Sequence, residues 1–110
     1  MKQGEIWYTN LNPTKGSEQS GFRPVLIISG NLLNQYAEVL ICVPLTTKIK
    51  NYHGNLILVP SDTNGLKETS EALTLHVRSI SKSRLKQRLG KISSDELQQV
   101  LNCVHELLTY

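Results

Sequence analysis

The sequence lacks most of the motifs from which a function can be inferred directly. Its two cysteines, Cys42 and Cys103, have no metal-ligand spacing around them, and its three histidines, His53, His76 and His105, are scattered. It contains no phosphate-binding glycine loop and no nucleophile elbow. The sequence therefore gives no indication of a metal site, a nucleotide-binding site or a serine-hydrolase site. We expect both cysteines to be buried free thiols, and we expect neither a metal ion nor another cofactor.

Long hydrophobic runs are also missing. The first ten residues, MKQGEIWYTN, lack the apolar core of a signal peptide, and no segment has the length of a membrane span. With seven Gly, four Pro, 39% hydrophobic and 19% charged residues, the composition predicts neither disorder nor a fibrous repeat. A chain of 110 residues can close one modest hydrophobic core. We therefore expect residues 1–110 to form a single globular domain in the cytoplasm.

Positive charge is in mild excess and is unevenly distributed. Twelve Lys and Arg against nine Asp and Glu give a formal net charge of +3, which does not identify a nucleic-acid partner by itself. Half of the basic residues fall in a stretch without acidic residues, at Arg78, Lys82, Arg84, Lys86, Arg88 and Lys91. Such a run is either a solvated face or a surface that follows a phosphate backbone.

Short β-rich runs fill most of the first eighty residues. These runs occupy residues 5–10, 23–29, 39–43, 55–59 and 72–77. Residues 25–28 and 39–43 are continuously apolar, which predicts central strands covered on both faces. Residues 85–92 predict a further strand, with a bulge or bend at Gly90. Many short strands joined by polar turns predict a barrel or a sandwich.

The C-terminal residues change to the period of a helix. Ser93 and Glu96 have the spacing of a capping box. Apolar side chains then recur at helical spacing, at Leu97, Val100, Leu101, Val104 and Leu108. The opposite face carries Gln98, Asn102 and His105. We expect one helix on the outside of the sheet, with its apolar stripe facing the core.

A long polar segment, NPTKGSEQSG, leads through Arg23 and Pro24 into a buried strand. Pro24 fixes its own φ and favours extended geometry at Arg23, so the guanidinium is held at the start of the strand. In this position Arg23 would stabilise a phosphate or a pentacoordinate transition state through two parallel hydrogen bonds. The alternative is a structural role, either an ion pair with Glu18 or a cap on the loop.

A second polar cluster follows the apolar strand in VPLTTKIKNYHGN. Thr46 and Thr47 stand at the end of that strand, and composition alone makes them ordinary β-formers with exposed hydroxyls. The next residues add positive charge and two rings that can stack on unpaired bases, at Lys48, Lys50, Tyr52 and His53. A solvated loop explains these residues equally well.

Three stretches together resemble the MazF/PemK family of toxin endoribonucleases, from about Gly4 to the C-terminal helix. They are GEIWYTNLNPTKGSEQSGFRPVLIIS, VPLTT and LHVRSISKSRL. The resemblance implies a mainly β fold with an α-helical part, namely a small SH3-like β-barrel of the MazF/CcdB type with a C-terminal helix. It also implies a homodimer that cleaves single-stranded RNA and is blocked by a cognate antitoxin.

The resemblance also implies the site residues. Arg23 matches the family's key arginine, Thr46 its key threonine and Glu18 the glutamate of its GSEQ motif, and these are the expected catalytic residues. The residues expected to bind RNA are Lys15, Gly16, Ser17, Gln19, Thr47, Lys48, Lys50, His53, His76, Arg78, Lys82 and Arg84. His76 replaces a glutamine of many members, which leaves the base preference open. By itself, His76 is expected to fill a partly buried strand position.

The expected mechanism is attack by the RNA 2'-hydroxyl on its own adjacent phosphate, which leaves a cyclic phosphate and a 5'-hydroxyl. Arg23 would stabilise the phosphorane charge, Thr46 would hydrogen-bond a phosphate oxygen, and Glu18 would act as base or orienter. Two alternatives stay open. One is a non-enzymatic toxin similar to the CcdB inhibitors of DNA gyrase, and the other is a module that binds RNA or an antitoxin without cutting.

Overall fold

The computed structural model describes residues 1–12 and 21–109. The strands are β1 (Glu5–Asn10), β2 (Phe22–Ile27), β3 (Val39–Thr46), β4 (Ile57–Leu58), β5 (Ser70–Ala72), β6 (Arg78–Ser81) and β7 (Leu85–Lys91). The helices are α1 (Asn31–Tyr36) and α2 (Ser94–Thr109), with 3₁₀ turns η1 (Thr74–His76) and η2 (Lys82–Arg84).

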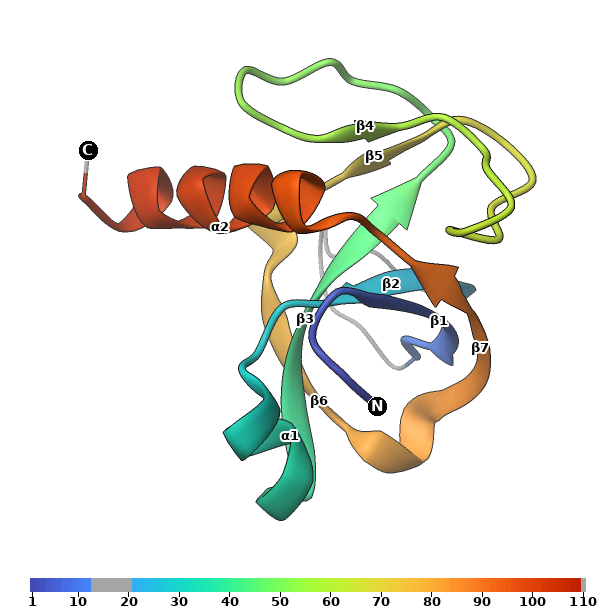
Figure 1. The fold of residues 1–110 in the computed structure, drawn as a ribbon, viewed down its shortest axis with the longest axis vertical. Coiled ribbons are helices and arrows are strands. Elements are labelled where there is room, and N and C mark those ends of the chain that lie inside the picture. Colours follow the sequence, from blue (N-terminus) through green and yellow to red (C-terminus); the bar gives the residue numbers. More distant parts are fainter. Residues whose placement is uncertain (13–20, 110) are drawn as a thin grey trace.

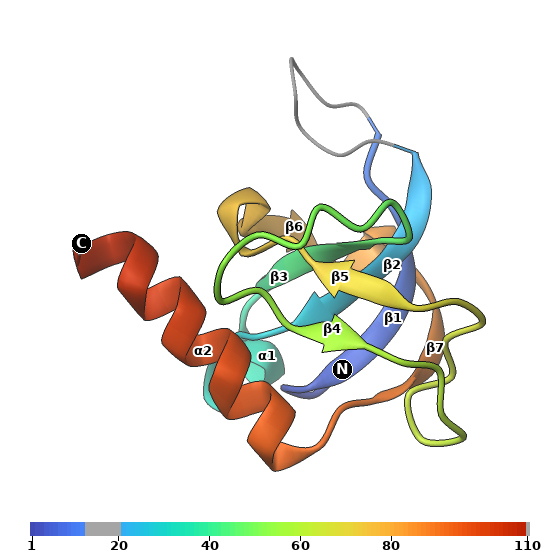
Figure 2. The same cartoon turned by 90° about the horizontal axis from the view of Figure 1, so that it is seen from above.

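The strands form one antiparallel sheet in the order β4-β5-β3-β2-β1-β7, and β6 also pairs with β3. The sheet curls into a half-barrel, and α2 lies along one side of it (Figures 1 and 2). The expected mainly β fold with a C-terminal helix is confirmed. The observed β4 is shorter than the run predicted at residues 55–59.

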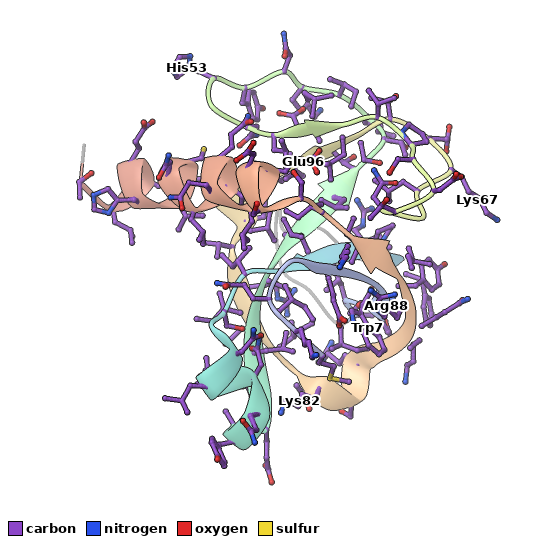
Figure 3. The ribbon with its side chains drawn as sticks, viewed as in Figure 1. Trp7, His53, Lys67, Lys82, Arg88 and Glu96 are labelled. Atoms are coloured by element: carbon purple, nitrogen blue, oxygen red, sulfur yellow. The ribbon has the colours of Figure 1, made fainter. Side chains whose placement is uncertain are left out.

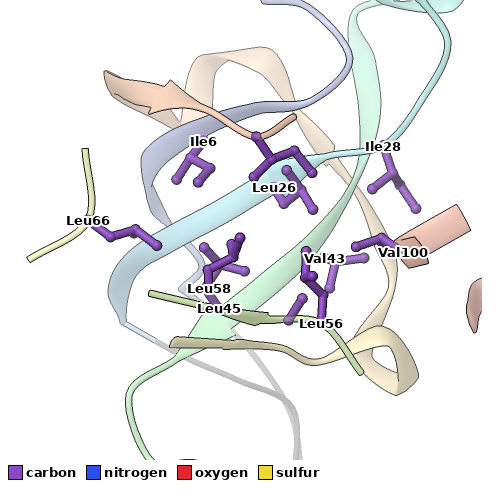
Figure 4. Close-up of a cluster of buried hydrophobic side chains, with 11 residues drawn as sticks. Ile6, Leu26, Ile28, Val43, Leu45, Leu56, Leu58, Leu66 and Val100 are labelled. Carbon is purple, nitrogen blue, oxygen red and sulfur yellow. The ribbon is translucent and has the colours of Figure 1, made fainter. Parts of the chain in front are cut away.

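Apolar side chains gather on both faces of β2. Leu26 belongs to the main core inside the half-barrel (Figure 4), and Val25 and Ile27 belong to a second cluster on the other face. Successive residues of a strand point to opposite faces, so a strand between two clusters must be apolar throughout. The prediction of burial on both faces is confirmed for this strand. It is wrong for the first half of β3, where Val39 and Ile41 are 45% and 37% exposed.

The start of α2 shows the predicted capping box. The backbone amide of Ser93 donates to Glu96 Oε1 at 2.8 Å, and the amide of Glu96 donates to Ser93 Oγ at 3.1 Å. Val100 is fully buried against the main core, as the apolar stripe predicted. Leu108 is 80% exposed, because the last turn of the helix extends past the sheet (Figure 1). No helix in the described part of the chain is long and apolar enough to cross a membrane.

The strand predicted at residues 72–77 is wrong. Ala72 ends β5 opposite Leu45, the chain then makes the 3₁₀ turn η1, and Arg78 starts β6 opposite Cys42. The interruption lies beside Pro44 of β3, which has no backbone N–H to donate to a neighbouring strand. A single β-like run of sequence therefore supplies two strands and a turn.

Both cysteines are buried and free, as expected. Burial raises the pKa of the Cys42 thiol to about 12, although the neighbouring Arg78 charge opposes this shift. Cys103 belongs to α2 and lies 3.2 Å from the hydroxyl of Thr74. Both thiols are thus buried in the fold.

A β-bulge in β7 confirms the irregularity predicted at Gly90. Gly90 stands opposite Ile6 and Arg88 opposite Trp7, so Leu89 is the extra residue. The backbone of residues 63–65 lies directly on this bulge. A Cβ at Gly90 would lie 2.3 Å from the carbonyl oxygen of Thr63 and 2.5 Å from the carbonyl carbon of Asn64. Only glycine fits at this crossing of two backbone segments.

We predict that Gly90→Ala lowers the free energy of unfolding by about 1 to 3 kcal/mol, because the new methyl group overlaps backbone atoms that cannot rotate away. The matched control is Gly30→Ala, since a Cβ at Gly30 meets no atom within 4 Å. Urea unfolding of both variants measures the difference. Equal midpoints for the two variants would contradict the assignment.

The carboxylate of Glu5 joins the N-terminal residues, β1 and β7. Its Oε1 accepts from the Trp7 indole and from the Lys2 amide, both at 2.9 Å, and its Oε2 accepts from Arg88 Nε at 3.0 Å. Trp7 and Arg88 lie side by side in Figure 3. Burial raises the pKa of Glu5, but the hydrogen bonds from Trp7, Lys2 and Arg88 outweigh it and lower the pKa from 4.5 to about 2.

Because the folded pKa lies below the unfolded value, Glu5 stabilises the fold above about pH 4.5, and this contribution is lost as the pH falls toward about 2. We predict that Glu5→Gln removes about 2 to 3 kcal/mol of stability near neutral pH and much less at about pH 2.5. Denaturant unfolding of both proteins across this pH range tests the prediction. A deficit that does not depend on pH would refute it.

Candidate functional site

The register of β2 and β3 brings two distant motifs to the same end of the sheet. Val25 stands opposite Pro44 in this antiparallel pair. Extending the register by two residues places Arg23 across from Thr46. Both residues line one pocket of about 470 Å³. The start of β2 and the end of β3 therefore form a common site.

This pocket, called the Arg23 pocket below, is rich in positive charge. Its lining residues are Phe22, Arg23, Pro24, Leu45, Thr46, Thr47, Lys48 and Lys50. Three of these described side chains are cationic and none is acidic, so the pocket attracts an anionic ligand. Five predicted site residues meet here, namely Arg23, Thr46, Thr47, Lys48 and Lys50.

The hydroxyl of Thr46 is held by the backbone that follows it. Thr46 is 7% exposed, and its Oγ1 accepts a hydrogen bond from the Lys48 amide at 3.1 Å. Accepting this bond leaves the hydroxyl proton able to donate to a ligand oxygen. Arg23 pairs with Thr9 in the extended part of β2, as its position before Pro24 predicted. A guanidinium and a hydroxyl donor therefore serve the same pocket.

A second pocket of about 390 Å³ adjoins the first and shares Pro24 and Thr47 with it. Tyr8 lines this pocket between Pro24 and Gln87, its partners on the two neighbouring strands. The Tyr8 ring stacks on Phe22, with centroids 5.9 Å apart and planes inclined by 22°. The two pockets combine a cationic end with an end that offers aromatic and amide groups beside the charged side chains of Lys67 and Glu68.

A third hollow, of about 400 Å³, lies beside α2 and has the opposite character. Asp95 and Glu106 line it together with Gly54, and none of its described lining residues is basic. Carboxylates repel phosphates, so this hollow does not suit a nucleic acid. Within residues 1–12 and 21–109, no three His, Cys, Asp or Glu side chains gather in a way that could hold a metal ion. The Arg23 pocket is the candidate functional site.

Comparison with protein families decides the assignment. Residues 2–108 match the family described as PemK-like, MazF-like toxins of type II toxin-antitoxin systems. The chain belongs to this family. The match covers nearly the whole chain, and it confirms the resemblance found in the sequence.

Individual relatives of this PemK-like, MazF-like toxin are consistent with the family match. Endoribonuclease MazF9 of Mycobacterium tuberculosis is 33% identical over 105 residues, which cover 91% of the chain and 89% of that protein. Endoribonuclease MazF of Staphylococcus saprophyticus is 30% identical over 105 residues, covering 94% and 88%. The crystal structure of MazF from Deinococcus radiodurans superposes with a TM-score of 0.86 at 28% identity, covering 100% and 97%. These relatives do not favour the gyrase-inhibitor alternative.

Several predicted binding residues of the toxin lie away from the Arg23 pocket. His53 stands at the far end of the loop between β3 and β4 (Figure 3). It lines a hollow with Cys103 of α2. His76 belongs to η1 instead of a strand and is half-buried. Neither histidine lines the Arg23 pocket or the pocket beside it. The predicted residues Lys15, Gly16, Ser17, Glu18 and Gln19 lie outside the described residues.

Basic side chains of the run at residues 78–91 form hydrogen bonds to distant parts of the chain. Lys82 Nζ donates to the carbonyl of Asn34, and Arg84 Nη1 donates to the carbonyls of Asn10 and Asn12. Neither Lys82 nor Arg84 lines the Arg23 pocket. Lys82 and Arg84 therefore also have a structural role, and their binding to RNA stays a prediction.

Arg78 is a different case within this run. It stands opposite Cys42 in the pairing of β6 with β3, and it does not line the Arg23 pocket. Its Nη1 is buried and finds no hydrogen-bond partner among residues 1–12 and 21–109.

Sequence reasoning missed Tyr8, Phe22 and Gln87, which line the two pockets. The alternation of β1 contained a signal for Tyr8, because it must point away from the face that Trp7 occupies. Gln87 carried no comparable signal. Only the pairing of β7 with β1 brings its side chain beside Tyr8.

Proposed function

We propose that this toxin is an endoribonuclease that cleaves single-stranded RNA at the Arg23 pocket without a metal ion. The observation that carries the proposal is the meeting of Arg23, Thr46 and two lysines in one pocket, none of whose described lining residues is acidic. The names of the two relatives at 30% identity or more support the same activity. Because the proposed substrate is single-stranded RNA, we propose the cytoplasm as the location of the toxin.

The proposed reaction is a transesterification within the RNA. The 2'-oxygen forms a bond to the adjacent phosphorus while the bond from phosphorus to the 5'-oxygen breaks. A base accepts the 2'-hydroxyl proton, and the departing 5'-oxygen gains a proton. The products are a cyclic phosphate and a 5'-hydroxyl. This step requires no bound metal, because the nucleophile belongs to the substrate.

Arg23 and Thr46 would serve the phosphate in this reaction. A guanidinium stays protonated near neutral pH, so the role of Arg23 is to stabilise the negative charge that develops on the phosphorane. The Thr46 hydroxyl would donate to a second phosphate oxygen. Glu18, which lies outside the described residues, is proposed as the base or as the group that orients the 2'-hydroxyl.

The adjoining pocket would hold a neighbouring nucleotide. Lys48 and Lys50 supply charge for the backbone phosphates, and Tyr8 offers a ring for an unpaired base. Gln87 can both donate to and accept from a base edge. Choice among RNA sequences would depend in part on this second pocket.

The toxin is proposed to act as a homodimer that a cognate antitoxin blocks. Exposed apolar side chains on α1 and the first half of β3 support self-association, namely Leu32, Leu33, Tyr36, Val39 and Ile41. An antitoxin segment carrying acidic side chains would complement the Arg23 pocket.

We predict that Arg23→Ala reduces the rate of RNA cleavage by about 100-fold to 1,000-fold, the loss typical for removing one main transition-state donor. Cleavage of a long mixed-sequence RNA in EDTA measures the rate. The matched control is Lys91→Ala, which removes an exposed cation that lines neither pocket.

Two further results bear on the mechanism. A 2'-deoxy substitution at the mapped cut site is expected to block cleavage, and EDTA is expected to leave it intact. Undiminished cleavage by Arg23→Ala would refute the proposal. Inhibition of DNA gyrase without any RNA cleavage would establish the non-enzymatic alternative instead.

We predict that Thr46→Val lowers kcat by about 10-fold to 100-fold, because valine keeps the shape of threonine but cannot donate to the phosphate. Thr46→Ser keeps the hydroxyl and is expected to stay close to the wild-type kcat. Steady-state cleavage of a short RNA containing the cut site compares the two variants. Equal kcat values for valine and serine would remove Thr46 from the mechanism.

A further inference from the structure

Glu71 is a buried carboxylate that stands next to the candidate site without lining it. It lies in β5, directly opposite Thr46 of β3. Its exposed fraction is 0%, although an ionised carboxylate is costly to bury without partners. The proposed function gives Glu71 no role, so its burial requires an explanation.

Four hydrogen bonds from one loop surround this carboxylate. Oε1 accepts from the amides of Lys50 at 2.6 Å and Asn51 at 2.8 Å. Oε2 accepts from the amide of Tyr52 at 3.0 Å and from Asn55 Nδ2 at 2.8 Å. All four donors belong to the loop that connects β3 to β4.

The three amides form an anion-binding nest in the backbone. Asn51 has a φ of +57°, a left-handed conformation that turns successive N–H groups toward a common point. In this toxin the anion in the nest is a side chain of the same protein. The carboxylate therefore compensates three backbone donors and holds the left-handed turn in place.

The charge of Glu71 is stabilised where it stands. Burial by itself raises the pKa of the carboxyl, but the hydrogen bonds from Asn55 and from the amides of Asn51, Lys50 and Tyr52 outweigh it. The net result is a pKa below the ordinary value of 4.5, so Glu71 is ionised at neutral pH.

The loop held in this way carries two cations of the Arg23 pocket. Lys48 follows Thr46 by two residues, and Lys50 donates its own amide to Glu71. Both side chains line the pocket with Arg23. Fixing the backbone at residues 50–52 restricts where these two ammonium groups can stand, and Glu71 also pairs with the strand that carries Thr46.

A second set of contacts ties the same loop to α2. Asn55 Oδ1 accepts from Thr74 Oγ1 at 2.7 Å, and that hydroxyl lies 3.2 Å from Cys103 Sγ. Asn55 thus joins Glu71 on one side and η1 on the other. Hydrogen bonds to Glu71 hold the middle of the loop, and the bond between Asn55 and Thr74 holds its end.

We propose that Glu71 is a positioning residue for RNA binding, whose carboxylate holds the loop of residues 48–52 so that Lys48 and Lys50 face the substrate phosphates. This inference rests on the proposed function. Glu71 does not contact the RNA itself, because its side chain is fully enclosed. Its effect is therefore expected in substrate affinity and its salt dependence, and not in the chemical step.

The test is Glu71→Gln, which keeps the size of the side chain but removes the charge and turns an amide group toward backbone donors. We expect the KM for a short RNA to rise about tenfold with kcat changed by less than about threefold. The slope of log affinity against log salt concentration is expected to become less steep, by the contribution of about one to two phosphate contacts. A purely structural defect would not change this slope.

Two comparisons make the test specific. Glu38→Gln removes the same charge at an exposed site that lines neither pocket, and it is expected to behave like the wild type. In the Glu71→Gln variant, adding Lys50→Ala is expected to lower RNA affinity less than Lys50→Ala does in the wild type. The reason is that both changes remove the same contact with the RNA. Should Glu71→Gln fail to fold, Asn55→Ala removes one of the four bonds to the carboxylate, together with the bond from Thr74, and is expected to shift KM and slope in the same direction.

Binding of an RNA with a 2'-deoxy cut site separates this inference from the proposed function. If the wild-type toxin neither binds nor cleaves RNA, the proposed function fails. If it does both, and Glu71→Gln has the wild-type affinity and salt slope, Glu71 does not position the loop. A fall in kcat alone would overturn the inference in the same way.

Discussion

The antiparallel pairing of β2 with β3 is the constraint on which the rest of the structure depends. β2 is buried between two apolar clusters, with Leu26 in one and Val25 in the other. A slip of one residue would exchange these faces and move every side chain of the strand to the wrong side. The register that both clusters enforce also places Arg23 across from Thr46. Core packing and the candidate site are thus fixed by the same contact.

The charged side chains of this toxin act through local contacts, and the small net charge of the chain does not reveal these contacts. Two ionised carboxylates with low pKa values, Glu5 and Glu71, hold backbone and side-chain donors inside the fold. Arg84 and Lys82 bind backbone carbonyls of distant segments. The cations left to line the candidate site come from the start of β2 and the loop after β3. The anion that orients this loop is hidden beneath it.

Much of the fold could be predicted from the sequence, because several elements are specified by local pattern. β1 was predicted with its observed bounds, and Ser93 and Glu96 marked the start of α2 correctly. The break within residues 72–77 was not predictable, since it arises where two strands meet β3 on either side of Pro44. The six-residue helix α1 was too short for a periodic signal.

The sequence by itself indicated the family, the proposed site residues Arg23 and Thr46, and the patterns that build the sheet and α2. These features depend on residue type and short spacing, which a linear pattern contains. Only the tertiary structure decided which cations share a pocket, that Tyr8 lies beside Gln87, and that Glu71 holds the loop of Lys50. The physical reason is that these contacts join segments far apart in the chain. Their proximity depends on strand register and burial, which no local pattern records.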